Sequence, residues 1–304
     1  MKKNILLLIE TVLVWGTVWY AIKFQLGETP IIVSVFYRIL LAAAVLLAYC
    51  LARSVPLRLP MRDHLHLGLM GAFLFSGNYY FFYVATGHIE SGLVSIIFST
   101  LVIVNSVNKR LFFGERMDAA VILGGVVGIA GVVLLFGGEL VGAREMTERL
   151  AGIGYAFLAT YMVSLGNLIS ARCSRRGIPV VTSTTLGLVY GTLLSGAIVL
   201  WQGHAFVVPP TPVYLGSLLY LSLFCTAIAF LLYLGLVKNA GPDKAAFATL
   251  LFPIVALAIS SVLENYRWTP TAALGVGLVL VGSSFSFFGD RMKAALSRSR
   301  VEVR

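Results

Sequence analysis

Residues 116–139, RMDAAVILGGVVGIAGVVLLFGGE, and residues 267–290, RWTPTAALGVGLVLVGSSFSFFGD, are the part of the sequence that decides the fold. The second stretch repeats the first at a distance of 151 residues. The matched pairs are Arg116/Arg267, Leu123/Leu274, Gly124/Gly275, Gly131/Gly282, Phe136/Phe287, Gly138/Gly289 and Glu139/Asp290. In each copy two glycines stand seven residues apart on one helix face, where the lack of a side chain lets a second helix approach closely. The repeat predicts a duplicated set of membrane helices, and an odd number of helices per copy would place the copies in opposite orientations.

The composition is that of a protein embedded in a lipid bilayer. Of the 304 residues, 59% are hydrophobic and only 12% are charged, and the mean hydropathy is +0.91. A soluble protein of this size needs far more charged residues to cover its surface. The net charge of +10 would suggest nucleic-acid binding in a soluble chain,. Here the basic residues lie where membrane topology requires them, so topology accounts for the positive net charge and we expect no nucleic-acid partner.

The apolar residues fall into ten segments, each close to the roughly 20 residues that a helix needs to cross a bilayer. They cover residues 4–22, 31–51, 65–86, 91–112, 119–138, 150–171, 179–201, 212–236, 244–263 and 271–289. With a cytoplasmic N-terminus, 18 of the 23 Lys and Arg residues lie inside, four lie outside and Arg38 lies within a helix. This bias predicts a multi-pass protein of the cell inner membrane with both termini cytoplasmic. The basic end of the chain could also contact anionic membrane lipids.

The topology makes the 151-residue repeat an inverted one. Helix 119–138 would run outward and helix 271–289 inward, so the two sets of five helices have opposite orientations. We therefore expect an all-α integral membrane fold of ten transmembrane helices in two inverted five-helix repeats. The expected boundaries are 1–140 for the first repeat, 149–290 for the second and 291–304 for a basic cytoplasmic tail. Residues 144–149 form a candidate hinge between the halves.

The sequence resembles the EamA-type branch of the drug/metabolite transporter superfamily over essentially its whole length. The shared features are Trp15-Gly16, Arg38, Gly114-Glu115-Arg116, the pair of glycines seven residues apart that follows, and Pro253. The resemblance implies two inverted five-helix repeats and export of small metabolites or drugs, with cargo that differs among members. The halves have diverged: Tyr266 stands where the repeat would place Glu115, and Val102 where it would place Pro253. They need not contribute equally to a substrate site.

The helix at 91–112 carries a polar stripe. Ser91, Ser95 and Ser99 are four residues apart and Ser106 follows seven later, so all four lie close to one face. Beside a water-filled cavity their hydroxyls would contact substrate. Against another helix, small serines would only permit close packing. Ser95 and Ser99 are candidates for substrate binding, as are the membrane amides Asn105 and Asn167, each of which could instead bond between helices.

Two full charges lie within the predicted helices. Arg38 lies about 10 Å into its helix at 1.5 Å per residue, where an arginine requires a partner or a cavity. It can bind a substrate carboxylate or phosphate. Alternatively it can hold the fold by snorkelling, or by pairing with Glu10 or with helix-end carbonyls. Glu10, about two turns from the cytoplasmic end of the first helix, is a candidate for proton coupling, or it lies in the headgroup region without a transport role.

Aromatic residues gather in two of the helices. Trp15 and Trp19 are four residues apart, and Tyr79 follows Asn78 in helix 65–86. Aromatic walls with a few polar groups suit a small amphipathic ligand, although aromatics also form interface belts and cores. We expect these four residues and Arg38 to contact substrate.

The pattern as a whole indicates a secondary active transporter rather than an enzyme. The sequence contains no catalytic or metal-binding motif and no ATP-binding element, so we expect no metal and no cofactor. Pro253 would permit a kink that acts as a gate. We expect alternating-access export of small organic metabolites, amino acids or related amphipathic compounds, by a monomer or homodimer. The alternatives are export of drugs or lipid-linked cargo and, less favoured, a polytopic membrane enzyme acting on lipid.

Overall fold

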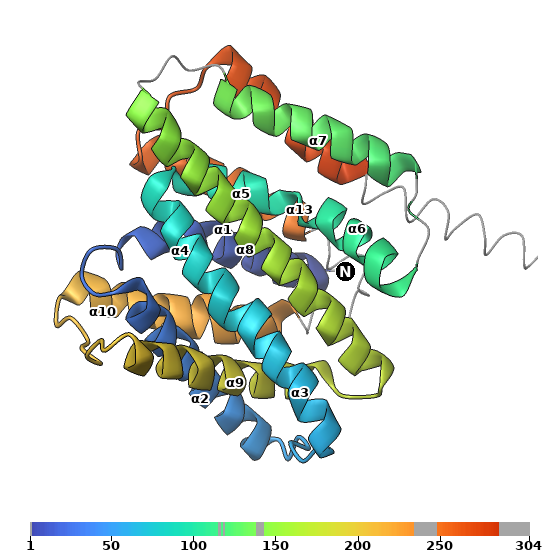
Figure 1. Cartoon of the computed structure of the whole chain (residues 1–304), viewed down its shortest axis with the longest axis vertical. Coiled ribbons are helices and arrows are strands. Elements are labelled where there is room, and N and C mark those ends of the chain that lie inside the picture. Colours follow the sequence, from blue (N-terminus) through green and yellow to red (C-terminus); the bar gives the residue numbers. More distant parts are fainter. Residues whose placement is uncertain (1, 115–116, 118, 138–142, 234–247, 286–304) are drawn as a thin grey trace, which may run out of the picture.

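The computed structural model describes residues 2–114, 117, 119–137, 143–233 and 248–285, and this part of the chain forms ten helical segments and no strand (Figure 1). Seven segments are single helices: α1 (Lys2–Lys23), α2 (Ile31–Ala52), α7 (Ala119–Gly137), α8 (Ala143–Arg175), α9 (Val180–Trp201), α13 (Ala248–Leu263) and a last helix, Pro270–Phe285. The other three are composite. One joins α3 (Met61–Met70), η1 (Gly71–Gly77) and α4 (Asn78–His88), one joins α5 (Ser91–Ser99) and α6 (Leu101–Phe113), and one joins α10 (Pro212–Leu219) and η2 (Tyr220–Ile228) and continues to Tyr233. Six of these segments are long and apolar enough to cross a membrane, and three more are shorter apolar helices. The predicted all-helical membrane architecture is confirmed, while the expected tail 291–304 lies outside the described residues.

Three of the expected helices are interrupted, which the sequence did not predict. Segments η1 and η2 are π-helical, with wider turns inside otherwise α-helical runs,. In η2 the Thr226 hydroxyl donates to the Leu221 carbonyl, five residues earlier, at 2.8 Å. Between α5 and α6 the helix breaks at Thr100, whose hydroxyl donates to the Ile97 carbonyl at 2.7 Å. Such hydroxyls compete with backbone amides for carbonyls and distort the helix locally.

The outside of the bundle is apolar and the inside holds small polar side chains. On α7 the side chains of Leu123, Val126, Ile129 and Val133 are each more than half exposed. On α9, by contrast, the run from Thr182 to Thr185 is almost completely buried. An apolar outer surface of this kind fits contact with lipid hydrocarbon.

The repeated glycines join α7 to the helix Pro270–Phe285, and the two helices lie together at one edge of the molecule (Figure 1). A Cβ atom on Gly131 would lie 2.6 Å from the Gly275 carbonyl oxygen, and one on Gly275 would lie 2.6 Å from the Gly131 carbonyl oxygen. A Cβ atom on Gly282 would likewise lie too close to the Gly124 carbonyl oxygen. The predicted close approach at these glycines is confirmed. Because Gly131 faces Gly275 and Gly124 faces Gly282, the two helices run antiparallel.

The remaining helices pack around the centre of the bundle. Helix α2 packs on α9, α4 on α8, and α13 on both α1 and α5, while η1 lies against α9 and η2 against α2. Residues 144–149, expected as a hinge, instead form the first turns of α8. There Arg144 pairs with Glu148 at 3.5 Å and Arg149 with Glu145 at 3.2 Å, both four residues apart, as suits a helix,.

One end of the bundle is held by a buried carboxylate, Glu264, just after α13. Its Oε1 lies 2.5 Å from Lys23 Nζ at the end of α1. Its Oε2 accepts hydrogen bonds from the Ser91 amide (3.0 Å) and hydroxyl (2.8 Å), and from the Ser260 hydroxyl. Burial raises the pKa of Glu264, but the hydrogen bonds from Lys23, Ser260 and Ser91 outweigh burial and leave the pKa below its ordinary value of 4.5,. Three helices, α1, α5 and α13, therefore meet at one ionised side chain.

This cluster predicts an acid-sensitive contribution to stability. A carboxyl group with a lowered pKa in the folded state stabilises the protein above its unfolded pKa, and the contribution disappears as the pH falls through the folded pKa. In detergent, the wild-type melting temperature should fall on acidification below about pH 4.5 more steeply than that of Glu264→Gln, which should already be less stable at neutral pH. Glu28→Gln, at an exposed glutamate, is the control. If the melting temperatures of the wild type and Glu264→Gln fall equally on acidification, ionised Glu264 does not contribute to stability in this way.

Candidate functional site

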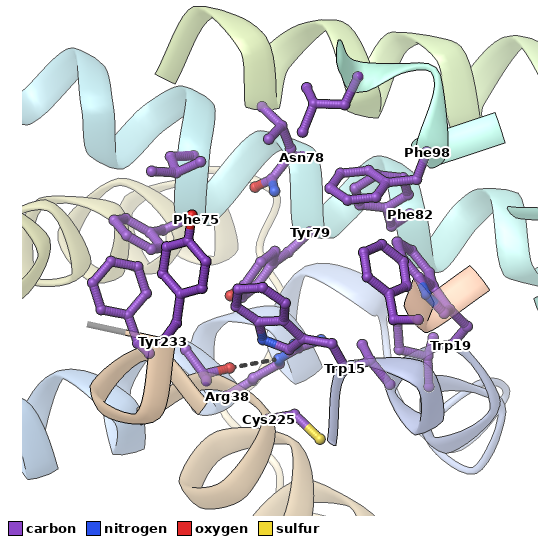
Figure 2. A pocket seen from close by; sticks show the side chains of 18 of the residues that line it. Trp15, Trp19, Arg38, Phe75, Asn78, Tyr79, Phe82, Phe98, Cys225 and Tyr233 are labelled. Carbon is purple, nitrogen blue, oxygen red and sulfur yellow. Dashed lines mark hydrogen bonds between the residues drawn. The ribbon is translucent and has the colours of Figure 1, made fainter. Parts of the chain in front are cut away.

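A cavity of about 270 Å³ lies among the helices (Figure 2). Its lining comes from most of the helical runs around the centre, and α2 contributes the charged Arg38. The apolar and aromatic residues are Trp15, Val18, Trp19, Ile22, Leu74, Phe75, Tyr79, Phe82, Phe98, Leu101, Val163, Leu188, Phe230, Tyr233 and Phe252. The polar and sulfur-containing ones are Arg38, Asn78, Asn167, Thr184, Cys225 and Thr226. A mostly apolar cavity of this size with a few polar groups is typical of sites for small organic ligands.

Aromatic rings form much of the cavity wall and hold one another in place. The Trp15 ring lies 5.3 Å from that of Tyr233 and 6.4 Å from that of Phe252, between centroids. Trp19 packs edge to face on Phe82 at 4.7 Å. Because these rings come from α1, α4, α13 and the run after η2, the wall depends on the relative position of several helices.

Arg38 is the charged group in the described part of the lining. Its side chain is only 3% exposed. Nε donates to the Thr226 hydroxyl at 3.3 Å, the dashed line in Figure 2, and the guanidinium carbon lies 4.2 Å from the Tyr79 ring centroid. Among the described residues no carboxylate lies within ion-pair distance of it, so the expected alternative of a pair with Glu10 is not formed. The Tyr83 ring centroid lies 5.9 Å from the same carbon, so the buried cation is stabilised by two aromatic rings and a hydroxyl,.

Two of the lining residues each carry a buried polar atom without a partner in the described structure. The Asn78 amide oxygen and the Trp19 indole nitrogen are buried and make no hydrogen bond within the described structure. Asn78 is 3% exposed and Trp19 is 6% exposed. A buried polar atom without a hydrogen bond costs about 1–3 kcal/mol, so a ligand that bonds it gains affinity.

The structure brings together Trp15, Trp19, Arg38, Asn78 and Tyr79, all predicted from the sequence, around one cavity. Ser95, Ser99 and Asn105 do not line it. The Ser95 hydroxyl donates to the Gly92 carbonyl and the Ser99 hydroxyl to the Ile96 carbonyl, both at 2.6 Å, so these serines bond within their own helix. The same helical run reaches the cavity through Phe98 and Leu101 instead. Substrate contact by the two serines and Asn105 remains a prediction.

The coupling and gating candidates, Glu10 and Pro253, are not among the residues that line the cavity. Glu10 is half-buried on α1, more than a turn before Trp15. Pro253 is inside α13 and buried, directly after the lining residue Phe252. Their proposed roles remain predictions.

Apart from Asn167, the lining residues from the second half were missed by the sequence reasoning, although a signal was present. The 151-residue spacing that relates the glycine pairs also takes Leu74 to Cys225, Tyr79 to Phe230 and Phe82 to Tyr233. It takes Leu101 to Phe252 as well, and all eight residues line the cavity. Applying the repeat to the predicted contact Tyr79 would have found Phe230.

The fold and the cavity define the class: a polytopic membrane protein with a mostly apolar cavity among its helices. The chain belongs to the EamA-like transporter family, whose sequence model matches residues 2–137 and again 150–288.

Its relatives agree with this class. It is 26% identical to the "Uncharacterized transporter YvbV" of Bacillus subtilis over 298 residues, covering 96% of this chain and 93% of that protein. It is 25% identical to the "Uncharacterized inner membrane transporter YedA" of Escherichia coli K12, covering 88% and 87%. A third relative, the "Probable amino-acid metabolite efflux pump" of the same strain, is 24% identical, covering 97% and 98%. A crystal structure that is 21% identical has a TM-score of 0.66 over 96% of this chain and 99% of that one, which shows the fold alone.

Proposed function

We propose that this protein is a secondary active transporter that exports small organic metabolites, amino acids or related amphipathic compounds, by alternating access around the cavity. The observation that carries the proposal is the cavity itself, with aromatic walls, one buried arginine and two buried polar atoms that make no hydrogen bond within the described structure. The name of the Escherichia coli relative, an amino-acid metabolite efflux pump, agrees with this cargo class.

An inverted repeat supports alternating access, because two similar halves of opposite orientation can exchange conformations. The antiparallel glycine contact between α7 and the last helix favours this arrangement. So do the π-helical segments, since η1 begins at Gly71 and η2 contains Ser222, 151 residues later. The paired lining positions would then lie around a pseudo-twofold axis through the cavity. We assign residues 1–140 and 149–290 to the two repeats.

The proposed setting is the cytoplasmic membrane with both termini in the cytoplasm, as the distribution of basic residues favours. The relative YedA is named as an inner membrane transporter. In this orientation the Lys23–Glu264 cluster lies at the outer end of the bundle. The protein would act as a monomer or homodimer among lipids. The proposed role of Glu10 as a proton carrier can be tested by comparing the flux of Glu10→Gln with and without a pH gradient.

Flux into proteoliposomes tests the proposed function. Purified protein should raise the uptake of labelled phenylalanine or a related amphipathic acid above that of protein-free vesicles, and the solute should be recovered chemically unchanged. A lipid altered by the protein, with no solute flux, would favour the alternative of a membrane enzyme. Flux restricted to drugs or lipid-linked molecules would favour the other alternative.

Gating predicts a specific change in accessibility. The runs 91–113 and 248–263 correspond by the repeat, and we expect them to close opposite ends of the cavity, with Pro253 allowing α13 to bend. Single cysteines placed along both runs should therefore change their reaction with a membrane-impermeant thiol reagent when substrate is added, in opposite directions for the two helices. If neither helix changes, the gating role is wrong.

A further inference from the structure

We propose that the cavity selects small organic monoanions, specifically carboxylates that carry an apolar ring and a neutral hydroxyl, over zwitterions and cations of the same shape. The inference rests on the proposed transport function and specifies the substrate class of its site. It is carried by the charge balance of the cavity and by its unpaired polar atoms.

The charge balance favours a ligand with one negative charge. Arg38 is the one charged side chain in the described lining, and no described carboxylate pairs with it. Charges interact far more strongly in a protein interior within a membrane than in water. A monoanion would bring the occupied cavity to zero net charge. A zwitterion would leave it at +1 and place an ammonium near the guanidinium, and a cation would bring it to +2.

Arg38 is held in position to meet a carboxylate. Thr226 has a single hydroxyl proton, which it donates to the Leu221 carbonyl at 2.8 Å. Its oxygen is therefore oriented to accept from Arg38 Nε at 3.3 Å. The Tyr79 ring covers one face of the guanidinium at 4.2 Å. Thr226 is thus a positioning residue: it fixes one edge of a planar group that can otherwise bind a carboxylate with two parallel hydrogen bonds.

The unpaired atoms favour a hydroxyl over an ammonium. The Asn78 amide oxygen needs a donor and the Trp19 indole nitrogen needs an acceptor. A hydroxyl can donate and accept, whereas an ammonium has three donors and no acceptor. In Figure 2 Tyr79 lies between Asn78 and Arg38, so a carboxylate at Arg38 and the hydroxyl on its adjacent carbon can lie along the Tyr79 ring, with the hydroxyl toward Asn78. The surrounding rings of Trp15, Phe82 and Phe252 would take its apolar part.

Four ligands with one phenyl ring test this directly: 2-hydroxy-3-phenylpropanoate, 3-phenylpropanoate, phenylalanine and 3-phenylpropanamide. The first and third differ only in a hydroxyl against an ammonium. Equilibrium binding to the purified full-length protein in detergent can be followed by calorimetry. We expect the hydroxy acid to bind at least about tenfold more tightly than phenylalanine, a difference of about 1.4 kcal/mol, with 3-phenylpropanoate second. Phenylalanine binding as tightly as the hydroxy acid, or no binding by either carboxylate, would overturn the inference.

Single substitutions test which side chains produce the preference for the hydroxy acid. Arg38→Gln should bind the carboxylates no better than the neutral amide, and Asn78→Ala should lose the difference between the hydroxy acid and 3-phenylpropanoate. Thr226→Val should weaken binding of the carboxylates but not of the amide, and Thr226→Ser should restore it. A purely structural role of Thr226 would weaken all ligands alike. Leu40→Ala, on the exposed side of α2, is the control for the helix.

Binding and flux separate this inference from the proposed function. If the hydroxy acid binds as expected but no solute crosses proteoliposome membranes, the ligand class stands and transport is wrong. If phenylalanine is transported while the carboxylate anions do not bind preferentially, transport stands and the inference is overturned.

Discussion

Replacing Arg38 with alanine should abolish transport while leaving a folded protein. Removing one partner from a buried charged interaction costs about 2–5 kcal/mol, which corresponds to a loss of at least about 30-fold. The guanidinium has no described carboxylate to leave uncompensated, and its contacts include one threonine hydroxyl and the rings of Tyr79 and Tyr83. We therefore expect flux in proteoliposomes to fall by at least this factor, with a thermal melting temperature close to that of the wild type.

Two comparisons make the Arg38 result interpretable. Leu40→Ala changes the exposed side of the same helix and should retain full flux. Arg38→Lys keeps the charge but not the planar geometry, so it should recover flux only partly. If Arg38→Ala fails to fold in the membrane, or melts far below the wild type, the structural interpretation of Arg38 is correct and its role in cargo binding is wrong.

Adding a single methyl group at Gly275 should have a comparably large effect on folding. Its Cβ would lie 2.6 Å from the Gly131 carbonyl oxygen and 2.6 Å from the Leu135 amide nitrogen, and backbone atoms cannot move aside as a flexible side chain can. We expect Gly275→Ala to destabilise the protein by about 3 kcal/mol or more, the upper end for forcing volume into a packed interface. The yield of folded protein after detergent extraction and the melting temperature measure this.

Gly277 provides the matched control, because it lies two residues away in the same helix with no atom within 4 Å of the added Cβ. Gly277→Ala should be neutral or stabilise the helix by up to about 1 kcal/mol. Equal stability of the two variants would mean that α7 and the last helix do not pack at their glycines.

Much of the fold was predictable because lipid imposes strong rules on sequence. Apolar segments of about 20 residues mark helices, and glycines seven residues apart mark a contact that the structure forms at Gly131 and Gly275. The interruptions were not predictable in the same way. The π turn at Thr226 and the break at Thr100 depend on hydroxyl groups bonding to particular carbonyls, and apolar periodicity is insensitive to these.

The site was predictable where residue type alone limits the possibilities. A buried arginine or asparagine in a membrane needs a partner or a cavity, and Arg38 and Asn78 lie at one. Serine is ambiguous, because its hydroxyl can bond to its own helix, as Ser95 and Ser99 do,. Helix rotation decides which face reaches the cavity, so Phe98 lies there while its neighbour Ser99 does not. Packing against α13, α8 and α1 fixes that rotation.

Counterflow in proteoliposomes tests the central claim, alternating access around this cavity, most directly. Vesicles containing the protein and a high concentration of unlabelled 2-hydroxy-3-phenylpropanoate or phenylalanine are diluted into a trace of the labelled solute. An alternating-access carrier exchanges the two, so the label should accumulate transiently above its outside concentration, remain chemically unchanged, and fail to accumulate with Arg38→Ala. Label that only equilibrates, that is chemically altered, or that accumulates equally in protein-free vesicles would contradict the account.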